Sequence, residues 1–498
     1  MNVNPITRLD YPDLDVIRVE DTYYMVSTTM HFMPGCEILQ SFDLVHWEHV
    51  TYVYETLDHT DAQQLKSGQN IYGQGMWAAS LRYHEDRFCI CFVANDTRKT
   101  YLYTSEKIDG PWKKQLIEGF YHDGSLLFDE DGRNYIVYGN DEIWITELNE
   151  DLTAPKKDGL HRLLVSDHKN PELGYEGSHI QKINGYYYIF LIHSLRDRWM
   201  RTEACFYSDS LEGEFTGGDV LCDDRGYCGQ GVAQGGIVDT PDGKWYAMLF
   251  QDSGAVGRIP ILLPVTWKDH FPFFGQNGHV PEEIEVHSTR PGYIYQPLVG
   301  SDDFCNGLLP RWQFNHDPDP QYYHLDALQG TYTITTREVC TELTQAVNTL
   351  TQRMSYPSCA AEVTVDASAL KEGDVAGLCA LQSCYAAVGI TKHHGKYEVL
   401  MLDKKEDGIL DMTEGTVVES HQMDFRLEAD FCNMKDEARC YYRVNKGDWL
   451  PIGTVHKLYF KLDHFTGCRF GLFCYAAEET GGSACFRDFK YYDVDEIS

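Results

Sequence analysis

Residues 16–28, VIRVEDTYYMVST, contain an apolar run, a short polar turn and a second run rich in aromatic residues. The same pattern returns four more times, at residues 80–95 (SLRYHEDRFCICFVAN), 125–139 (SLLFDEDGRNYIVYG), 178–193 (SHIQKINGYYYIFLIH) and 236–250 (GIVDTPDGKWYAMLF). Two turns contain Asp-Gly and one contains Asn-Gly, which supply the positive φ angles of tight β-hairpins. Hairpins spaced by roughly 45–65 residues are typical of propeller blades. The five copies therefore predict an all-β fold that begins with a five-bladed β-propeller.

The pattern changes after residue 281, where a connector containing proline and glycine (residues 287–304, HSTRPGYIYQPLVGSDDF) leads into a second region. Alternating runs such as TYTITTR, AAEVTVDA and KLYFKLDH then continue to the end of the chain, separated by polar turns. Many short strands with little helical periodicity indicate a β-sandwich. We therefore predict a propeller domain in residues 1–300 and a sandwich domain in residues 301–498.

The composition excludes several classes of partner. Acidic residues outnumber basic residues by 76 to 42, which gives the 498-residue chain a formal net charge of −34. Such a surface repels nucleic-acid phosphates and anionic lipids, so we expect neither nucleic-acid nor membrane partners. The first residues, MNVNP, lack the basic and apolar regions of an export signal, and the chain has sixteen cysteines. We therefore expect reduced thiols and a cytoplasmic location, and a homo-oligomer is compatible with the sequence.

Three carboxylates occupy matching places, each shortly before the first strand of a hairpin. They are Asp13 in YPDLD, Asp123 in HDGS and Glu176 in YEGSH. Because the inner strands of a propeller converge on one axis, we expect the three side chains to share a pocket. Clustered carboxylates shift one another's pKa values, which suits general acid–base work on a C–O bond. An Asp before a strand can instead cap a turn, and we assign that role to Asp15, Asp129, Asp131, Asp239 and Asp242.

Four further residues are candidates for binding a sugar in the same pocket. Trp77 precedes the second hairpin, and its indole face could support a sugar ring; the alternative is an ordinary core tryptophan. Arg258 ends a Gly-x-x-Gly-Arg turn and could bind hydroxyl groups or a carboxylate; the alternative is a surface ion pair. His31 and Phe32, in the loop MHFMPG, could form a wall of the cavity, although a single histidine is more often structural.

Residues 1 to about 280 resemble glycoside hydrolase family 43, whose members are five-bladed propeller enzymes that act on arabinose- and xylose-containing glycans. The resemblance is carried by the opening phrase from NPI to SFDLVHW (residues 4–47), by HDGSLLFDEDG and by EGSH. It implies that Asp13 is the general base, that Glu176 is the general acid, and that Asp123 orients this acid and raises its pKa. The segment GRIPILLPVTW resembles the one whose arginine, here Arg258, reaches the sugar subsite. The C-terminal region resembles the concanavalin-like sandwich of the xylosidase and arabinofuranosidase branch.

One position departs from the family pattern. Many members carry a histidine at the start of the fifth blade that helps to hold a central calcium ion or water network. Gln234 lies at about that place here, in GVAQGG. An amide can bind water or substrate but is a weaker calcium ligand than a charged group. We therefore predict that the protein requires no cofactor and no metal, with a structural calcium ion as the alternative.

The sequence thus predicts an inverting exo-glycosidase that removes terminal β-1,4-xylosyl residues from short oligosaccharides. The first alternative is an α-L-arabinofuranosidase acting on arabinose-substituted glycans. A second alternative is a propeller that binds carbohydrate without catalysis. A retaining enzyme of the related invertase type is disfavoured, because the first blade reads YPDL rather than an Asn-Asp-Pro-Asn-type nucleophile phrase.

Overall fold

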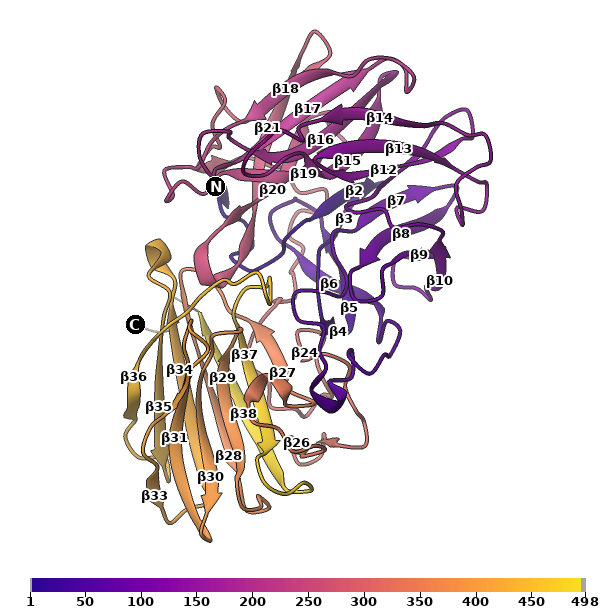
Figure 1. Ribbon diagram of the computed structural model, residues 1–498. Coiled ribbons are helices and arrows are strands. Elements are labelled where there is room, and N and C mark those ends of the chain that lie inside the picture. The colour runs from indigo at the N-terminus through magenta and orange to yellow at the C-terminus, as the bar shows by residue number, and fades with distance from the viewer. Residues whose placement is uncertain (1, 494–498) are drawn as a thin grey trace.

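The computed structural model describes residues 2–493, and Figure 1 shows a propeller, coloured indigo to magenta, beside a sandwich, coloured orange to yellow. Among the described residues, the only helices are four single-turn 3₁₀ helices, and the rest of the chain between strands is turns, bends and irregular segments. The predicted all-β fold, a five-bladed propeller followed by a sandwich, is confirmed. Among residues 2–493, no helix is long and apolar enough to cross a membrane.

The propeller contains five sheets of four antiparallel strands each. The first is β2 (Asp15–Val19), β3 (Thr22–Val26), β5 (Gly35–Ser41) and β6 (Glu48–Tyr54). The second is β7 (Ser80–His84), β8 (Arg87–Ala94), β9 (Lys99–Ser105) and β10 (Lys113–Ile117). The third is β11 (Ser125–Phe128), β12 (Asn134–Asn140), β13 (Glu142–Leu148) and β14 (His161–Ser166). The fourth is β15 (Glu176–Ile183), β16 (Tyr186–Ser194), β17 (Arg201–Ser208) and β18 (Thr216–Leu221). The fifth is β19 (Val232–Asp239), β20 (Trp245–Asp252), β21 (Arg258–Lys268) and β22 (Phe271–Phe274).

The hairpins that the sequence predicts form the two inner strands of each blade. In the fourth blade, Asn184 and Gly185 occupy the two-residue turn between β15 and β16, with φ of 52° and 84°. Two positive φ angles in succession define the turn type whose twist matches the flanking strands. The innermost strands contact one another in the ring order β2, β7, β11, β15, β19 and back to β2. Their N-terminal ends therefore meet around one central channel.

The ring is closed by a short pairing between its two ends. Strand β1 (Asn2–Val3) pairs with β23 (Glu283–Ile284), which follows the fifth blade. The side chain of Asn4 strengthens this closure, because its Nδ2 donates to the carbonyl oxygens of Leu262 and Pro281 at 2.8 and 3.0 Å. The first and last blades are thereby held together at the seam of the ring.

The sandwich consists of two sheets that enclose a large apolar core. One sheet has the order β32 (Leu410–Met412), β31 (Lys396–Lys404), β30 (Ala386–His393), β29 (Asp374–Leu381), β37 (Arg469–Ala476), β27 (Leu350–Arg353), β24 (Gln313–Asn315) and β4 (Phe32–Met33), with β33 (Thr416–Val418) also on β31. The other has the order β25 (Tyr323–Asp326), β26 (Thr331–Thr335), β38 (Ser483–Asp493), β28 (Ser358–Asp366), β34 (Gln422–Asp430), β35 (Glu437–Val444) and β36 (Leu450–Lys457).

One sandwich sheet extends into the propeller. Its last strand, β4, belongs to the loop between the second and third strands of the first blade, and it pairs with β24 of the sandwich. Figure 1 shows β24 and β27 lying beside β4 and β5 at the junction. The two domains therefore share a hydrogen-bonded sheet, and this sheet fixes the sandwich against the end of the propeller that carries the predicted carboxylates.

Candidate active site

The three predicted carboxylates lie at one end of the central channel. Asp13 precedes β2, Asp123 precedes β11, and Glu176 is the first residue of β15. The Oδ2 atom of Asp123 accepts the backbone N–H of Gly177 at 2.9 Å, which places Asp123 directly beside Glu176. The Nε2 atom of His122 lies 3.5 Å from Asp123 Oδ2 and 3.7 Å from Glu176 Oε2. The structure thus places Asp123 beside Glu176, and Asp13 lies near enough for its charge to raise the pKa of Asp123.

Asp13 is held as an acceptor by two donors. Its Oδ1 accepts from Arg258 Nη1 at 2.8 Å, and its Oδ2 accepts from the hydroxyl of Thr28 at 2.7 Å. The side chains of Asp13 and Arg258 are both almost completely buried. Asp13 also has a φ of 51°, a left-handed conformation that Asp and Asn tolerate better than most residues. Each carboxylate oxygen has a second lone pair, so one can still accept a proton from water.

Asp123 and His122 have shifted pKa values. Burial, and then the negative charges of Glu176 and Asp13, raise the pKa of Asp123 to about 6, although His122 and the N–H of Gly177 oppose this shift. The charge of Asp123 in turn raises the pKa of His122 to about 9, against the effect of burial. A cationic imidazole at His122 thus offsets part of the negative charge that Asp123 brings to the cluster.

Glu176 is the most exposed member of the cluster, with 23% of its side chain accessible. Its Oε2 accepts from Asn140 Nδ2 at 2.8 Å, which orients the carboxyl group. Asp123, by contrast, is buried, and its Oδ2 is occupied by the N–H of Gly177. Glu176 is therefore more accessible to a substrate oxygen than Asp123. Asp123 is buried next to it and binds the backbone of the following residue, Gly177.

Two predicted binding residues lie at the same end of the channel. The ring of Trp77 is 5.8 Å from that of His122, and the guanidinium of Arg258 contacts Asp13 as described above. The structure adds a residue from the sandwich that we did not predict. The ring of Phe465 lies 4.4 Å from the guanidinium carbon of Arg258 and 5.6 Å from the ring of Trp77. Phe465 lies in no recognisable sequence motif. It reaches Arg258 only because the two domains dock against each other.

His31 and Phe32 are placed differently. The ring of His31 packs against those of Phe32, Tyr72 and His316 in the junction between the domains. The ring of Phe32 is covered by the guanidinium of Arg469 at 3.5 Å. Both side chains are buried in this junction, and the contacts described there do not include the carboxylates. Their predicted role in binding substrate therefore has no support from their contacts.

Gln234 packs against Gly177, the residue that follows Glu176. Its backbone N–H donates to Glu203 Oε2 at 2.7 Å, and its side chain packs against Gly177, where a Cβ atom would lie 2.7 Å from the amide carbon. Gly177, at a φ of 64°, is thus required by both its conformation and this close approach. Burial raises the pKa of Glu203 well above its ordinary value, although the N–H of Gln234 opposes this shift. Gln234 helps to support the segment that carries Glu176.

The donor set does not suit calcium. Within residues 2–493, the one group of closely spaced metal-ligating side chains is His122, Asp123 and Glu176, whose ligand atoms lie within 4.8 Å of one another. Calcium prefers six to eight oxygen ligands, and a protonated imidazole has no free lone pair. These three side chains therefore do not match the ligand set that calcium prefers, and the expectation that activity needs no metal stays a prediction.

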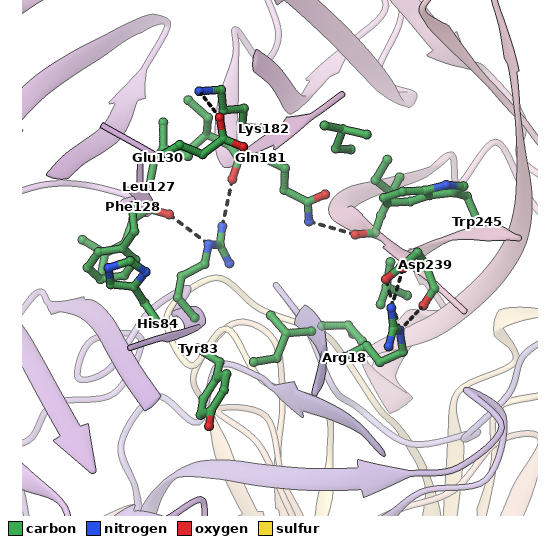
Figure 2. Close-up of a pocket in the computed structure, with 18 residues that line it drawn as sticks. Arg18, Tyr83, His84, Leu127, Phe128, Glu130, Gln181, Lys182, Asp239 and Trp245 are labelled. Atoms are coloured by element: carbon green, nitrogen blue, oxygen red, sulfur yellow. Dashed lines mark hydrogen bonds and ion pairs between the residues drawn. The ribbon is translucent and has the colours of Figure 1, made fainter. Parts of the chain in front are cut away.

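A cavity of about 490 Å³ lies at the C-terminal ends of the innermost strands and is lined by none of the three carboxylates. Figure 2 shows its charged side chains paired with one another, Arg18 with Asp239 and Lys182 with Glu130. Arg82 also lines this cavity, and its Nη1 donates to Asp15 Oδ2 at 2.7 Å. Although burial opposes ionisation, Arg82 and His179 lower the pKa of Asp15 to about 2. The prediction that Asp15 caps a turn was wrong, because it joins the blades inside the channel.

The comparisons with known proteins agree with this geometry. The profile of glycosyl hydrolases family 43 matches residues 3–272, and the profile of the beta-xylosidase C-terminal concanavalin A-like domain matches residues 301–492. The propeller, the clustered carboxylates and these matches define a glycoside hydrolase that acts on oligosaccharides. More specifically, the chain belongs to glycosyl hydrolase family 43.

Individual relatives span nearly the whole chain. A beta-xylosidase of Formosa agariphila is 26% identical, with 99% of this chain and 89% of that protein aligned. A non-reducing end alpha-L-arabinofuranosidase of Bacteroides ovatus is 23% identical, with 82% of this chain and 79% of that protein aligned. The structure of a bifunctional GH43-CE protein of Bacteroides eggerthii is 42% identical and superposes with a TM-score of 0.93. That match covers 99% of this chain but only 64% of the other protein, which is therefore longer.

Proposed function

We propose that this protein is an inverting exo-glycosidase that removes terminal β-1,4-xylosyl residues from xylo-oligosaccharides. The observation that carries the proposal is the cluster in which buried Asp123 supports the more exposed Glu176, with Asp13 held separately by Arg258. Inversion is the general mechanism of family 43. The choice of xylose is supported by relatives named beta-xylosidases, and the arabinofuranosidase of Bacteroides ovatus supports α-L-arabinofuranosides as the alternative.

In this mechanism Glu176 gives its proton to the glycosidic oxygen as the bond to the anomeric carbon breaks. Asp13 takes a proton from a water molecule, whose oxygen attacks that carbon from the opposite face of the ring. The enzyme then returns to its starting state by moving one proton from Asp13 to Glu176 through solvent. In this mechanism the negative charge of Asp123 beside Glu176 favours the protonated form of the acid.

The exo mode is supported by the position of the sandwich. Phe465 and its neighbours lie over Arg258 and Trp77, so a domain other than the propeller covers one side of the carboxylate cluster. A covered pocket accommodates the end of a glycan chain more readily than its middle. We also propose a reducing, cytoplasmic location, which is supported by the sixteen cysteines, all of them free.

The decisive experiment measures hydrolysis by the purified protein. We expect para-nitrophenyl β-xyloside and xylobiose to be cleaved faster than para-nitrophenyl α-L-arabinofuranoside. Proton NMR at early times should show α-xylose as the first product, since inversion changes the anomer. β-Xylose as the first product would contradict inversion, and a faster arabinofuranoside reaction would select the alternative. Binding of xylobiose without any cleavage would instead identify a non-catalytic carbohydrate-binding protein.

Asp123→Asn should lower activity and move the basic limb of the kcat/KM profile to lower pH. The asparagine keeps the size of the side chain but removes the negative charge that helps Glu176 to hold its proton. The acid is then deprotonated at a lower pH than in the unmodified protein. Profiles of both proteins between pH 4 and about 9 would test this, with thermal melting as the check on folding. An unchanged basic limb would show that Asp123 does not act on the acid electrostatically.

A further inference from the structure

The loop that carries Phe465 is stacked onto the propeller through the preceding residue. We call residues 459–468, between β36 and β37, the interdomain loop. In this loop the ring of His464 lies parallel to that of Tyr72 from the propeller, with centroids 3.9 Å apart and an interplanar angle of 2°. Aromatic pairs of this kind add stability beyond their buried area. The stack thus joins the two domains at the residue next to Phe465.

The Tyr72 ring is itself fixed in place. Its hydroxyl donates to the carbonyl oxygen of Thr344 at 2.6 Å and accepts from Asn315 Nδ2 at 2.6 Å. The rings of His31 and His316 contact it edge-on, at 4.7 and 4.5 Å between centroids. A ring held by two neighbouring rings and at its hydroxyl presents one face to His464. The Tyr72 face is therefore a rigid surface rather than a mobile side chain.

The backbone of the interdomain loop also lies close to the propeller on this side. A Cβ atom at Gly73, which has a φ of 66°, would lie only 2.7 Å from the carbonyl oxygen of Asp463. Glycine is the residue that permits such an approach. The N–H groups of His464 and Phe465 both donate to the carbonyl oxygen of Lys461, which closes the loop into a turn. The turn and the stack together orient the residue that follows His464.

A second attachment lies on the other side of Phe465. The N–H of Gly467 donates to Asp10 Oδ2 at 2.8 Å, and the N–H of Cys468 donates to the carbonyl oxygen of Ala255 at 2.8 Å. The other oxygen of Asp10 accepts the backbone N–H of Arg258 at 2.7 Å. The loop is thus fixed to the propeller on both sides of Phe465, whose ring lies over the guanidinium that holds Asp13.

We propose that His464 and Tyr72 are positioning residues, which place Phe465 against Arg258 and Trp77 and so complete the wall of the active site. The inference rests on the proposed function for its kinetic consequences. His464 does not touch the carboxylates; it acts through Phe465. Burial lowers the pKa of His464 to about 3, so the imidazole is neutral at working pH and contributes as an aromatic surface.

The test is a double-mutant cycle between positions 464 and 465, measured on whichever glycoside the unmodified protein cleaves. Phe465→Ala should lower kcat/KM by about 10–100-fold, because the substrate would be positioned less accurately without this ring. His464→Ala should lower it by a similar factor, whereas His464→Phe, which keeps a flat ring, should stay within about threefold of the unmodified protein. The double variant His464→Ala, Phe465→Ala should be no worse than Phe465→Ala alone. Losses that multiply would overturn the proposal, because His464 would then act independently of Phe465.

A second measurement does not depend on activity. Hydrogen–deuterium exchange of residues 459–468 should become at least tenfold faster in His464→Ala and in Tyr72→Leu, and should stay unchanged in His464→Phe. His421→Ala, which alters an exposed sandwich histidine paired with Asp366, serves as the matched control. Unchanged exchange in both Tyr72→Leu and His464→Ala would refute the positioning role even if no glycoside were cleaved. Failure to cleave any glycoside would refute the proposed function alone.

Discussion

Glu176→Gln should reduce kcat/KM on xylobiose by about 10²–10⁴-fold, the usual contribution of a general acid. Glutamine has nearly the same shape and can still bind Asn140, but it has no proton to give to the glycosidic oxygen. A sugar hydroxyl is a poor leaving group, so the natural substrate depends fully on that proton. The measurement compares steady-state kinetics on xylobiose for the variant and the unmodified protein, with circular dichroism to confirm the fold.

The dependence on the leaving group makes this test specific. On a 2,4-dinitrophenyl β-xyloside, whose leaving group departs without protonation, the same variant should lose far less activity. Glu172→Gln is a matched control, because Glu172 is an exposed acid only four residues earlier in the chain. Equal losses on both substrates would show that Glu176 has another role than proton donation. Near-normal turnover of xylobiose would refute the assignment altogether.

The hairpin repeat in the sequence was the basis on which the three acids were grouped. Some hairpins contain a turn that favours a few residue types, as at Asn184-Gly185, and every blade has the same order of strands. Equivalent places in a repeat become neighbours around an axis, so Asp13, Asp123 and Glu176 could be grouped without any knowledge of long-range contacts. The same logic failed for Asp15, which is only two residues further on, because it enters the channel and binds Arg82.

Residues that depend on the docking of the two domains could not be found in this way. Phe465 and Tyr72 are almost 400 positions apart in sequence, and neither lies in a repeated phrase. Their neighbours are set by the pairing of β4 with β24 and by the close approach at Gly73. His122 lies between these two cases. It directly precedes Asp123 in the sequence, so a place near the carboxylates could have been predicted for it. Its raised pKa follows from the carboxylates that surround it in space, which adjacency alone does not reveal.

Asp13→Asn should also reduce kcat/KM by about 10²–10⁴-fold, but with a different dependence on substrate. Asp13 is expected to activate the attacking water, and that step is needed whether or not the leaving group requires a proton. The loss should therefore be similar on xylobiose and on the dinitrophenyl xyloside, in contrast to Glu176→Gln. An inverting enzyme separates its two carboxyl groups by roughly 6.5–9.5 Å to admit this water, whereas a retaining enzyme needs about 5–5.5 Å.

Asparagine is the appropriate replacement because it tolerates the φ of 51° at position 13 and keeps an oxygen that can accept from Arg258. Breaking a buried ion pair completely costs about 3–5 kcal/mol of the free energy of unfolding. We therefore expect Asp13→Asn to lower this free energy by less than that. Chemical denaturation of the variant separates this effect from catalysis. If Asp13→Asn spared the dinitrophenyl substrate while abolishing cleavage of xylobiose, Asp13 would be the acid rather than the base. If the residual product of Asp13→Asn were β-xylose, the attack on the opposite face of the ring would be wrong.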